Sequence, residues 1–159
     1  ALRSVGTVPA ARQRTDSHAF VAALADTANS LCRPARLTFV LRENWQGSFL
    51  CAAPELTRAL ENILDNAVGH TPAGGTVTLD VSKAEDTLVF TVTDTGPGFT
   101  PEALHKAGQF LYTDAARPDN GHQGLGLYLA RSVAQAHGGK LVLANTGTGA
   151  HVQLCLPMQ

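Results

Sequence analysis

Two neighbouring runs of alternating apolar residues constrain the fold of this chain most strongly. Residues 77–81 and 88–92 carry an apolar side chain at every second position, namely Val77, Leu79, Val81, Leu88, Phe90 and Val92. An alternation of period two predicts β-strands, and the short connection at residues 83–87 predicts that the strands pair as an antiparallel hairpin. One face of this hairpin is apolar, so another layer of structure must cover it.

That covering layer is predicted to be helical. Residues 54–68 begin at a proline, which the first turn of a helix tolerates, and they end at Gly69. Their apolar stripe at helical spacing consists of Leu56, Leu60, Ile63, Leu64 and Ala67. Two further amphipathic helices are expected, one that begins near Asp16 or Ser17 and one near Leu125 that ends at residues 138–139.

Four more segments have strand character. Residues 37–43 and 48–52 flank a predicted turn at residues 44–47, and two strands at residues 140–145 and 151–156 flank a Thr-Gly-Thr-Gly connection. Strands in hairpins mixed with amphipathic helices predict an α+β fold, with helices on one face of a mixed sheet.

The composition is that of an ordinary globular protein. Of its 159 residues 44% are hydrophobic and 16% are charged, which favours one domain with a real core. The net charge of -1 argues against bulk nucleic-acid binding, and no apolar run approaches the roughly 20 residues that span a bilayer. The three cysteines are far apart and form no CxxC pair, so we expect neither a disulfide framework nor a zinc site.

Two asparagines, Asn62 and Asn66, stand four positions apart in the helix at residues 54–68. Their side chains share one face, roughly opposite the apolar stripe. A solvated polar face would explain this pair, but asparagine is a mediocre helix former beside Lys or Glu. Its neutral carbonyl oxygen suits Mg²⁺ that also keeps waters and substrate phosphates, and it adds no repulsion against a triphosphate.

Residues 94–99 read Asp-Thr-Gly-Pro-Gly-Phe at the end of the second hairpin strand. An ordinary turn with an Asx cap would explain the motif. Two glycines that flank a proline also let the backbone pass close to a flat ligand. The carboxylate of Asp94 can accept a hydrogen bond from an exocyclic amine, which adenine has and guanine replaces with a carbonyl.

The segment at residues 95–123 is long and rich in glycine, with one short helix predicted after an N-cap at Thr100. A segment of this length with little regular structure is usually functional or mobile. Residues 121–127 then open a helix, where exposed N–H groups and the helix dipole favour phosphate. A polar loop rather than a strand precedes them, which argues against a Rossmann fingerprint, and no P-loop is present.

Together these motifs resemble the ATP-binding catalytic (CA) domain of bacterial two-component sensor histidine kinases, over roughly residues 16–157. The matching segments are residues 60–67 for the N box, 94–99, 124–127 and 147–149 for the three glycine boxes, and Phe110 for the F box. The resemblance implies the Bergerat fold, a two-layer α/β sandwich with a mixed sheet of about five strands, three main helices on one face and a long lid loop at residues 99–123.

The resemblance also implies ATP and Mg²⁺ as cofactors and a set of site residues. Asn66 would be the Mg²⁺ ligand, Asn62 a second polar contact near metal or phosphate, and Asp94 the partner of the adenine amino group. Gly96 and Gly98 would line the base. The full nucleotide-binding set is Asn62, Asn66, His70, Asp94, Gly96, Gly98, Phe99, Arg117, Gly124, Leu125, Gly126 and Leu127, of which residues 124–127 would hold phosphates.

Some positions depart from the family pattern. Gly69 and His70 stand where Lys and Tyr often follow the second Asn, so a charge is lost, although His70 could still stack on adenine. Tyr112 stands where the lid often has Arg, and Arg117 is either a substitute charge or a solvated side chain. Ala150 stands where the last glycine box usually has Thr.

Position 62 separates two reactions. In the hydrolytic relatives a Glu there activates water, whereas Asn62 cannot take a proton at neutral pH, and Glu61 lies about 100° around the helix. We therefore expect a protein-histidine kinase that donates the γ-phosphoryl group of Mg-ATP to a histidine on a separate dimerisation domain, without a general base in this chain. The alternatives are an ATPase of the superfamily, a nucleotide-binding regulatory module without catalysis and, more distantly, a serine kinase of the anti-sigma type.

No His-Glu-x-x-Thr-Pro run is present, so the phosphoacceptor is expected outside this chain. Residues 1–15 are interpreted as a linker or the end of an upstream dimerisation domain, and residues 16–159 as the catalytic domain. The expected partners are the dimerisation and histidine-phosphotransfer domain of the same kinase and, indirectly, a response regulator, with no nucleic acid. The fragment is expected to be a monomer and to be the cytosolic part of a membrane-bound sensor.

Overall fold

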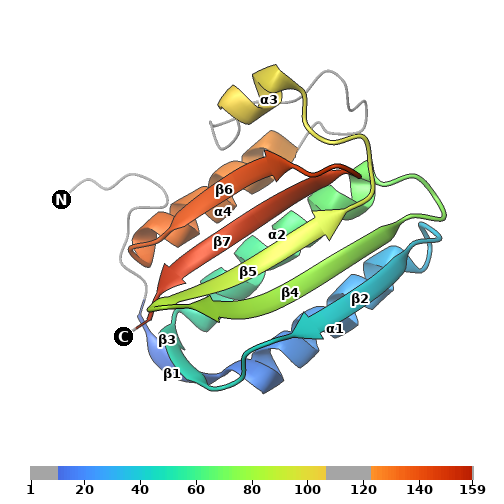
Figure 1. Ribbon diagram of the computed structural model, residues 1–159. Coiled ribbons are helices and arrows are strands. Elements are labelled where there is room, and N and C mark those ends of the chain that lie inside the picture. The colour runs from blue at the N-terminus through green and yellow to red at the C-terminus, as the bar shows by residue number, and fades with distance from the viewer. Residues whose placement is uncertain (1–10, 107–122, 159) are drawn as a thin grey trace.

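The computed structural model describes residues 11–106 and 123–158, which form a two-layer α/β sandwich (Figure 1). The helices are α1 (Ser17–Cys32), α2 (Ala53–His70), α3 (Pro101–Lys106) and α4 (Gln123–Ala136). The strands are β1 (Gln13–Asp16), β2 (Thr38–Glu43), β3 (Ser48–Cys51), β4 (Thr76–Ala84), β5 (Thr87–Asp94), β6 (Lys140–Asn145) and β7 (Ala150–Pro157).

The main sheet has five strands in the order β2-β4-β5-β7-β6. β2 pairs with β4 in parallel, and every other pair in this sheet is antiparallel. Helices α1, α2 and α4 lie against the same face of the sheet, whereas α3 lies beyond its end (Figure 1). The expected mixed sheet, with three main helices on one face, is therefore confirmed.

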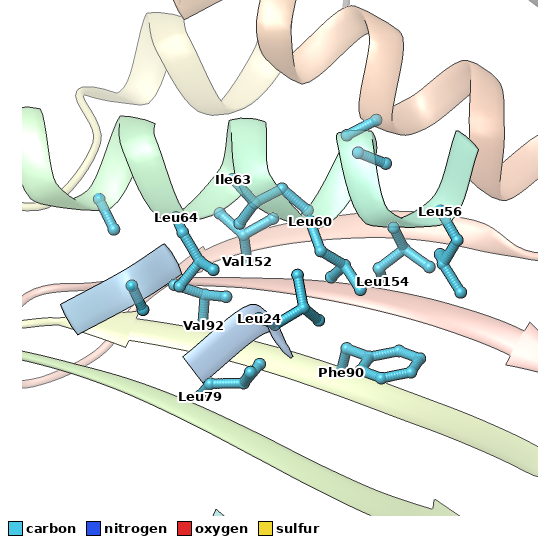
Figure 2. Packing of buried hydrophobic residues seen from close by; sticks show 14 of the residues in the cluster. Leu24, Leu56, Leu60, Ile63, Leu64, Leu79, Phe90, Val92, Val152 and Leu154 are labelled. Carbon is cyan, nitrogen blue, oxygen red and sulfur yellow. The ribbon is translucent and has the colours of Figure 1, made fainter. Parts of the chain in front are cut away.

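The core lies between α2 and the hairpin of β4 and β5. The alternating residues of both strands are buried, with Leu79 opposite Val92 and Val81 opposite Phe90. Figure 2 shows the apolar stripe of α2 directed onto these strands and onto β7. Burial of each large apolar side chain stabilises the fold by about 1.5–3 kcal/mol, so this contact fixes α2 on the sheet.

Helix α1 begins as predicted, because the side chain of Asp16 accepts a hydrogen bond from the N–H of Ala19 at 2.9 Å. Helix α2 differs from its prediction at the C-terminus. It continues through Gly69 to His70, and the hydroxyl of Thr71 then donates to the carbonyl of Ala67 at 2.7 Å. This bond satisfies a carbonyl of the last turn, so the helix does not need glycine to end.

The two segments that flank residues 44–47 are strands, but they do not pair with each other. β2 joins the main sheet, whereas β3 pairs with β1 in a separate two-stranded sheet. The physical reason lies at the start of α1, where Ser17 and Gly47 exchange two hydrogen bonds of 2.9 Å. These bonds hold the turn against α1. The pairing with β3 also ties Gln13, which lies within the segment interpreted as a linker, to the rest of the domain.

A buried histidine links α4 to the start of α2. His137 is 4% exposed, its Nδ1 donates to the carbonyl of Val133 at 2.8 Å, and its Nε2 accepts from the N–H of Ala52 at 3.0 Å. These two roles require the neutral tautomer with the proton on Nδ1. Arg12, which precedes β1, separately donates to the carbonyl of Ala136 at 2.6 Å and so ties the N-terminal segment to the end of α4. The bond between His137 and Ala52 joins the end of α4 to the start of α2.

No helix in the described parts of the chain has both the length and the apolar character needed to cross a membrane.

Candidate functional site

Asn66 lies in a buried environment rather than on a solvated helix face. It is only 4% exposed, and its Oδ1 is buried and has no hydrogen-bond partner among residues 11–106 and 123–158. An unsatisfied buried carbonyl costs roughly 1–3 kcal/mol, so such an atom in a folded protein needs an explanation. A ligand or a metal ion would supply one, since a neutral amide oxygen is a suitable Mg²⁺ ligand. Asn66 therefore fits the role that its spacing suggested.

Asn62, one turn earlier, is half-buried and opens onto a groove between α2 and α4. The groove has a volume of about 390 Å³ and is lined by Glu55, Arg58, Ala59, Asn62, Leu129, Ser132 and Val133. Asn62 and Asn66 thus lie on one helix but in different surroundings. Asn66 is buried, whereas Asn62 is half-buried and lines the groove.

Asp94 ends β5 as a buried carboxylate that is 4% exposed. Its Oδ1 accepts a hydrogen bond from the N–H of Gly96 at 2.8 Å, and the backbone of Ala150 provides another. Burial raises the pKa of Asp94 above its ordinary value of 3.8, and these two bonds act in the opposite direction. No cationic side chain in the described part of the chain pairs with it. A buried carboxylate that is oriented but unpaired is typical of a binding site.

The glycine turn after β5 packs against the C-terminal end of α2. A β-carbon on Gly96 would collide with the backbone oxygen of His70 and would lie 3.1 Å from Oδ1 of Asp94. Gly98 has a φ of +83°, which favours glycine, and a β-carbon there would lie 2.8 Å from Oδ1 of Asn145. The structure thus brings Asp94, Gly96 and His70 together, although they come from two separate motifs.

Phe99 differs in part from its assignment to the nucleotide-binding set. Its side chain is 6% exposed and belongs to the hydrophobic core. Its backbone is held by the side-chain amide of Asn145, a residue that sequence reasoning missed. The available signal was weak, namely one polar residue between the end of a strand and a glycine-rich loop. A single asparagine in that setting is most often an ordinary turn residue.

The remaining predicted residues lie around α4 and the segment before it. Gly124, Leu125 and Gly126 are in the first turn of α4, where the backbone N–H groups have no partner within the helix. Leu127 follows them and is 6% exposed. Three positions lie outside the described residues, namely Arg117, the F-box residue Phe110, and Tyr112, which stands where the family often has Arg.

The chain matches a family model and sensor kinases of known sequence. Residues 51–159 match the model of the family of histidine kinase-, DNA gyrase B- and HSP90-like ATPases. The sensor histidine kinase SpaK of Bacillus subtilis is 42% identical over 106 residues, which are 65% of this chain and 23% of SpaK. The sensor protein SphS of Synechococcus elongatus is 31% identical over 165 residues, which cover 95% of this chain and 40% of SphS. The chain thus spans less than half the length of either relative.

Solved structures show the same fold at low sequence identity. The nucleotide-free catalytic domain of histidine kinase ThkA superposes with a TM-score of 0.83 at 17% identity, over 93% of this chain and 96% of that domain. Full-length ShkA in complex with AMPPNP gives a TM-score of 0.82 at 23% identity, over 96% of this chain and 32% of ShkA. Because the matching family model spans more than half of the chain, the protein belongs to the histidine kinase-, DNA gyrase B- and HSP90-like ATPase family, an assignment that implies the use of ATP.

Proposed function

We propose that this chain is the catalytic domain of a two-component sensor kinase. It binds Mg-ATP and donates the γ-phosphoryl group to a histidine on the separate dimerisation and phosphotransfer domain of the same kinase, which then serves a response regulator. The observation that supports this most directly is the buried oxygen of Asn66, which has no hydrogen-bond partner within the described part of the chain. It lies on the same helix whose last residue contacts the turn of Asp94 and Gly96.

Asp94 recognises the base in this proposal. Its carboxylate is held by two backbone N–H groups, so it reaches the ligand without further ordering of its side chain. In the ionised form it accepts a hydrogen bond from the exocyclic amine of adenine. The carbonyl at the corresponding position of guanine would be repelled, so the pocket selects ATP over GTP. Gly96 and His70 form the surroundings of this contact.

Asn66 holds the metal in this proposal. Mg²⁺ supplies neutralisation of phosphate charge and orientation of the γ-phosphoryl group when it is bound. The neutral amide of Asn66 contributes a ligand oxygen without adding a negative charge beside the phosphates. Asn62 lies one turn away at the groove between α2 and α4, where it would be a second polar contact near metal or phosphate. The first turn of α4, at residues 124–126, would offer its free N–H groups to phosphate.

Asn62 also determines the reaction. A side-chain amide cannot accept a proton from water at neutral pH, so attack by water is not assisted from this position. In the transfer reaction the imidazole nitrogen of the acceptor forms a bond with the γ-phosphorus, and the bond from that phosphorus to the bridging oxygen breaks as ADP leaves. The domain contributes positioning and charge neutralisation, which phosphoryl transfer chiefly requires.

The setting of the domain follows from the same reaction. We propose that residues 1–15 are a linker or the end of an upstream dimerisation domain, of which residues 13–15 also pair with β3. We further propose that the isolated chain is a monomer and that it works in the cytosol, where ATP is available, as part of a membrane-bound sensor.

The direct test is transfer of label from γ-labelled ATP to a separately produced dimerisation domain of the same kinase, with Mg²⁺ present. We expect an acid-labile phosphohistidine on the acceptor, no label with the Asp94→Asn variant, and slow release of phosphate without the acceptor. Fast release over many turnovers would instead favour an ATPase. Tight ATP binding without transfer to the correct partner would favour a regulatory module.

A further inference from the structure

The side chain of Asn145 pairs with the backbone of Phe99, 46 positions earlier in the chain. Nδ2 of Asn145 donates to the carbonyl of Phe99 at 2.8 Å, and the N–H of Phe99 donates to Oδ1 of Asn145 at 2.7 Å. One residue thereby exchanges both of its backbone hydrogen bonds with a side chain, as paired residues in an antiparallel sheet do with each other. A primary amide suits this role because it presents a donor and an acceptor side by side.

The neighbouring backbone is built around this amide. Gly98 has a φ of +83°, and a β-carbon on it would lie 2.8 Å from Oδ1 and 3.2 Å from Cγ of Asn145. Gly149, four residues after Asn145, packs against the backbone of Asp94 so closely that a β-carbon would collide with the Asp94 carbonyl. The loop from Asn145 to Gly149 and the end of α2 therefore both pack against the turn that begins at Asp94.

Asn145 itself is exposed, although its amide makes two hydrogen bonds. Replacing it leaves no cavity in the core, so the global fold depends little on this side chain. What depends on it is the local path of the backbone between the end of β5 and the start of α3, where Thr100 caps the helix through a 3.0 Å bond from the N–H of Ala103.

We propose that Asn145 is a positioning residue for the adenine pocket. Its amide fixes the backbone of Gly98 and Phe99, and through this turn it fixes Asp94 and Gly96 in the arrangement that receives the base. The inference rests on the proposed function, because it assigns Asn145 a role toward ATP. It concerns a different residue, Asn145, and a contact with the backbone of Phe99 that involves neither phosphate nor metal.

Asn145→Asp gives the sharpest test, because it keeps the shape and removes one donor. The carboxylate can still accept from the N–H of Phe99, but it cannot donate to the Phe99 carbonyl and repels it. Protonation restores a hydroxyl donor beside a carbonyl acceptor, which reproduces the pattern of the amide. ATP binding should therefore be weaker by about tenfold at pH 7.5, the effect of a single lost hydrogen bond. Because an exposed aspartate has a pKa of about 3.9, this deficit should narrow measurably as the pH falls to 5 without disappearing.

The measurement is calorimetric titration with a nonhydrolysable ATP analogue from pH 8 to pH 5, expressed as the ratio of wild-type to variant affinity. Protonation of the nucleotide occurs with both proteins, so it cancels in this ratio. Asn145→Leu adds no charge near Asp94 and therefore reports the loss of the amide alone. Asn145→Leu should lose affinity at every pH. Asn29→Asp is the matched control, because Asn29 is exposed on α1 and its amide donates to the carbonyl of Ala25 at 3.1 Å. The control should match the wild type.

Hydrogen exchange of the Phe99 amide in the nucleotide-free protein separates the two proposals. We expect several-fold faster exchange in Asn145→Leu, with an unchanged melting temperature. If the Phe99 amide exchanges faster in Asn145→Leu than in the wild type, but the wild type binds no ATP, the proposed function is wrong. If the wild type binds ATP and Asn145→Asp shows either the same affinity or a deficit that is independent of pH, the positioning role of Asn145 is wrong.

Discussion

A β-carbon on Gly96 would collide with the backbone oxygen of His70, so the turn after β5 lies directly against the last residue of α2. This contact joins the strand that ends at Asp94 to the helix that carries Asn66. Because the obstructing atom is backbone rather than the end of a flexible side chain, neither partner can move aside at low cost. The spacing between the two candidate binding groups therefore depends on glycine at position 96.

Gly96→Ala should weaken ATP binding by about tenfold or more, because the turn must shift away from α2 and take Asp94 with it. Calorimetric titration with ATP measures the loss. Asn29→Ala is the control, because Asn29 is exposed on α1, outside every segment assigned to the site. Equal affinities for the two variants would show that the contact with His70 does not position the site.

Asp94→Asn should reduce ATP affinity by about 10- to 100-fold or more while the fold remains intact. The amide keeps the shape of the side chain but loses the charge that strengthens the bond to the adenine amine, and hydrogen bonds to charged groups contribute about 1.5–3 kcal/mol. Titration with ATP and far-UV circular dichroism measure the two properties. A folded variant with wild-type affinity would show that the base binds elsewhere.

Asp94 should also make stability and binding respond to pH in opposite directions. Burial raises its pKa in the folded state above the ordinary 3.8, so the folded chain binds more protons than the unfolded chain between these two values. The free energy of unfolding therefore decreases as the pH rises through this window, whereas ATP affinity increases because the ionised carboxylate accepts the amine. Urea unfolding from pH 4 to pH 7 should show a shallower dependence in Asp94→Asn. Identical profiles would argue against the raised pKa.

Replacement of Asn66 should damage the Mg²⁺-dependent part of ATP binding. Asn66→Ala removes the unpaired oxygen, so the protein should bind ATP with nearly the same affinity whether Mg²⁺ or EDTA is present. Its free energy of unfolding should change little, because the loss of packing is offset by removal of an unsatisfied polar atom. A loss of affinity of equal size with and without metal would contradict the role of Asn66 as a ligand.

His137→Ala tests the connection between α4 and the start of α2. The substitution removes the acceptor for the N–H of Ala52 and leaves that group buried, so the free energy of unfolding should fall by about 2–4 kcal/mol. Urea unfolding at neutral pH measures this change. His105→Ala, on the exposed face of α3, is the control and should stay within about 0.5 kcal/mol of the wild type. Equal stabilities would show that the hydrogen bond to Ala52 contributes nothing.

The sequence predicts well those features that depend on neighbouring residues. The hairpin of β4 and β5 follows from strict alternation over a short connection, and the start of α1 follows from the cap at Asp16. The two strands that flank residues 44–47 are also indicated by the sequence, but it does not reveal that they join different sheets, because the bonds between Ser17 and Gly47 hold the turn against α1. Residues 13–16 show no apolar alternation, so the sequence does not predict strand β1 or its pairing with β3.

The candidate site divides in the same way. Asp94 and Asn66 stand in motifs with characteristic spacing, so the sequence indicates them directly. Their burial does not follow from spacing. A helical wheel places Asn66 on a polar face, whereas in the structure its side chain is buried. Asn145 and His137 act on residues 46 and 85 positions away, and no local pattern reports contacts of that range.

The most direct test of the account is calorimetric titration of the wild-type chain with ATP and with GTP, each with and without Mg²⁺. We predict that ATP binds more tightly than GTP by at least about tenfold, that Mg²⁺ strengthens ATP binding, and that Asp94→Asn removes the preference for adenine. Equal affinity for the two nucleotides, or a preference for ATP that survives in Asp94→Asn, would contradict the assignment of this site.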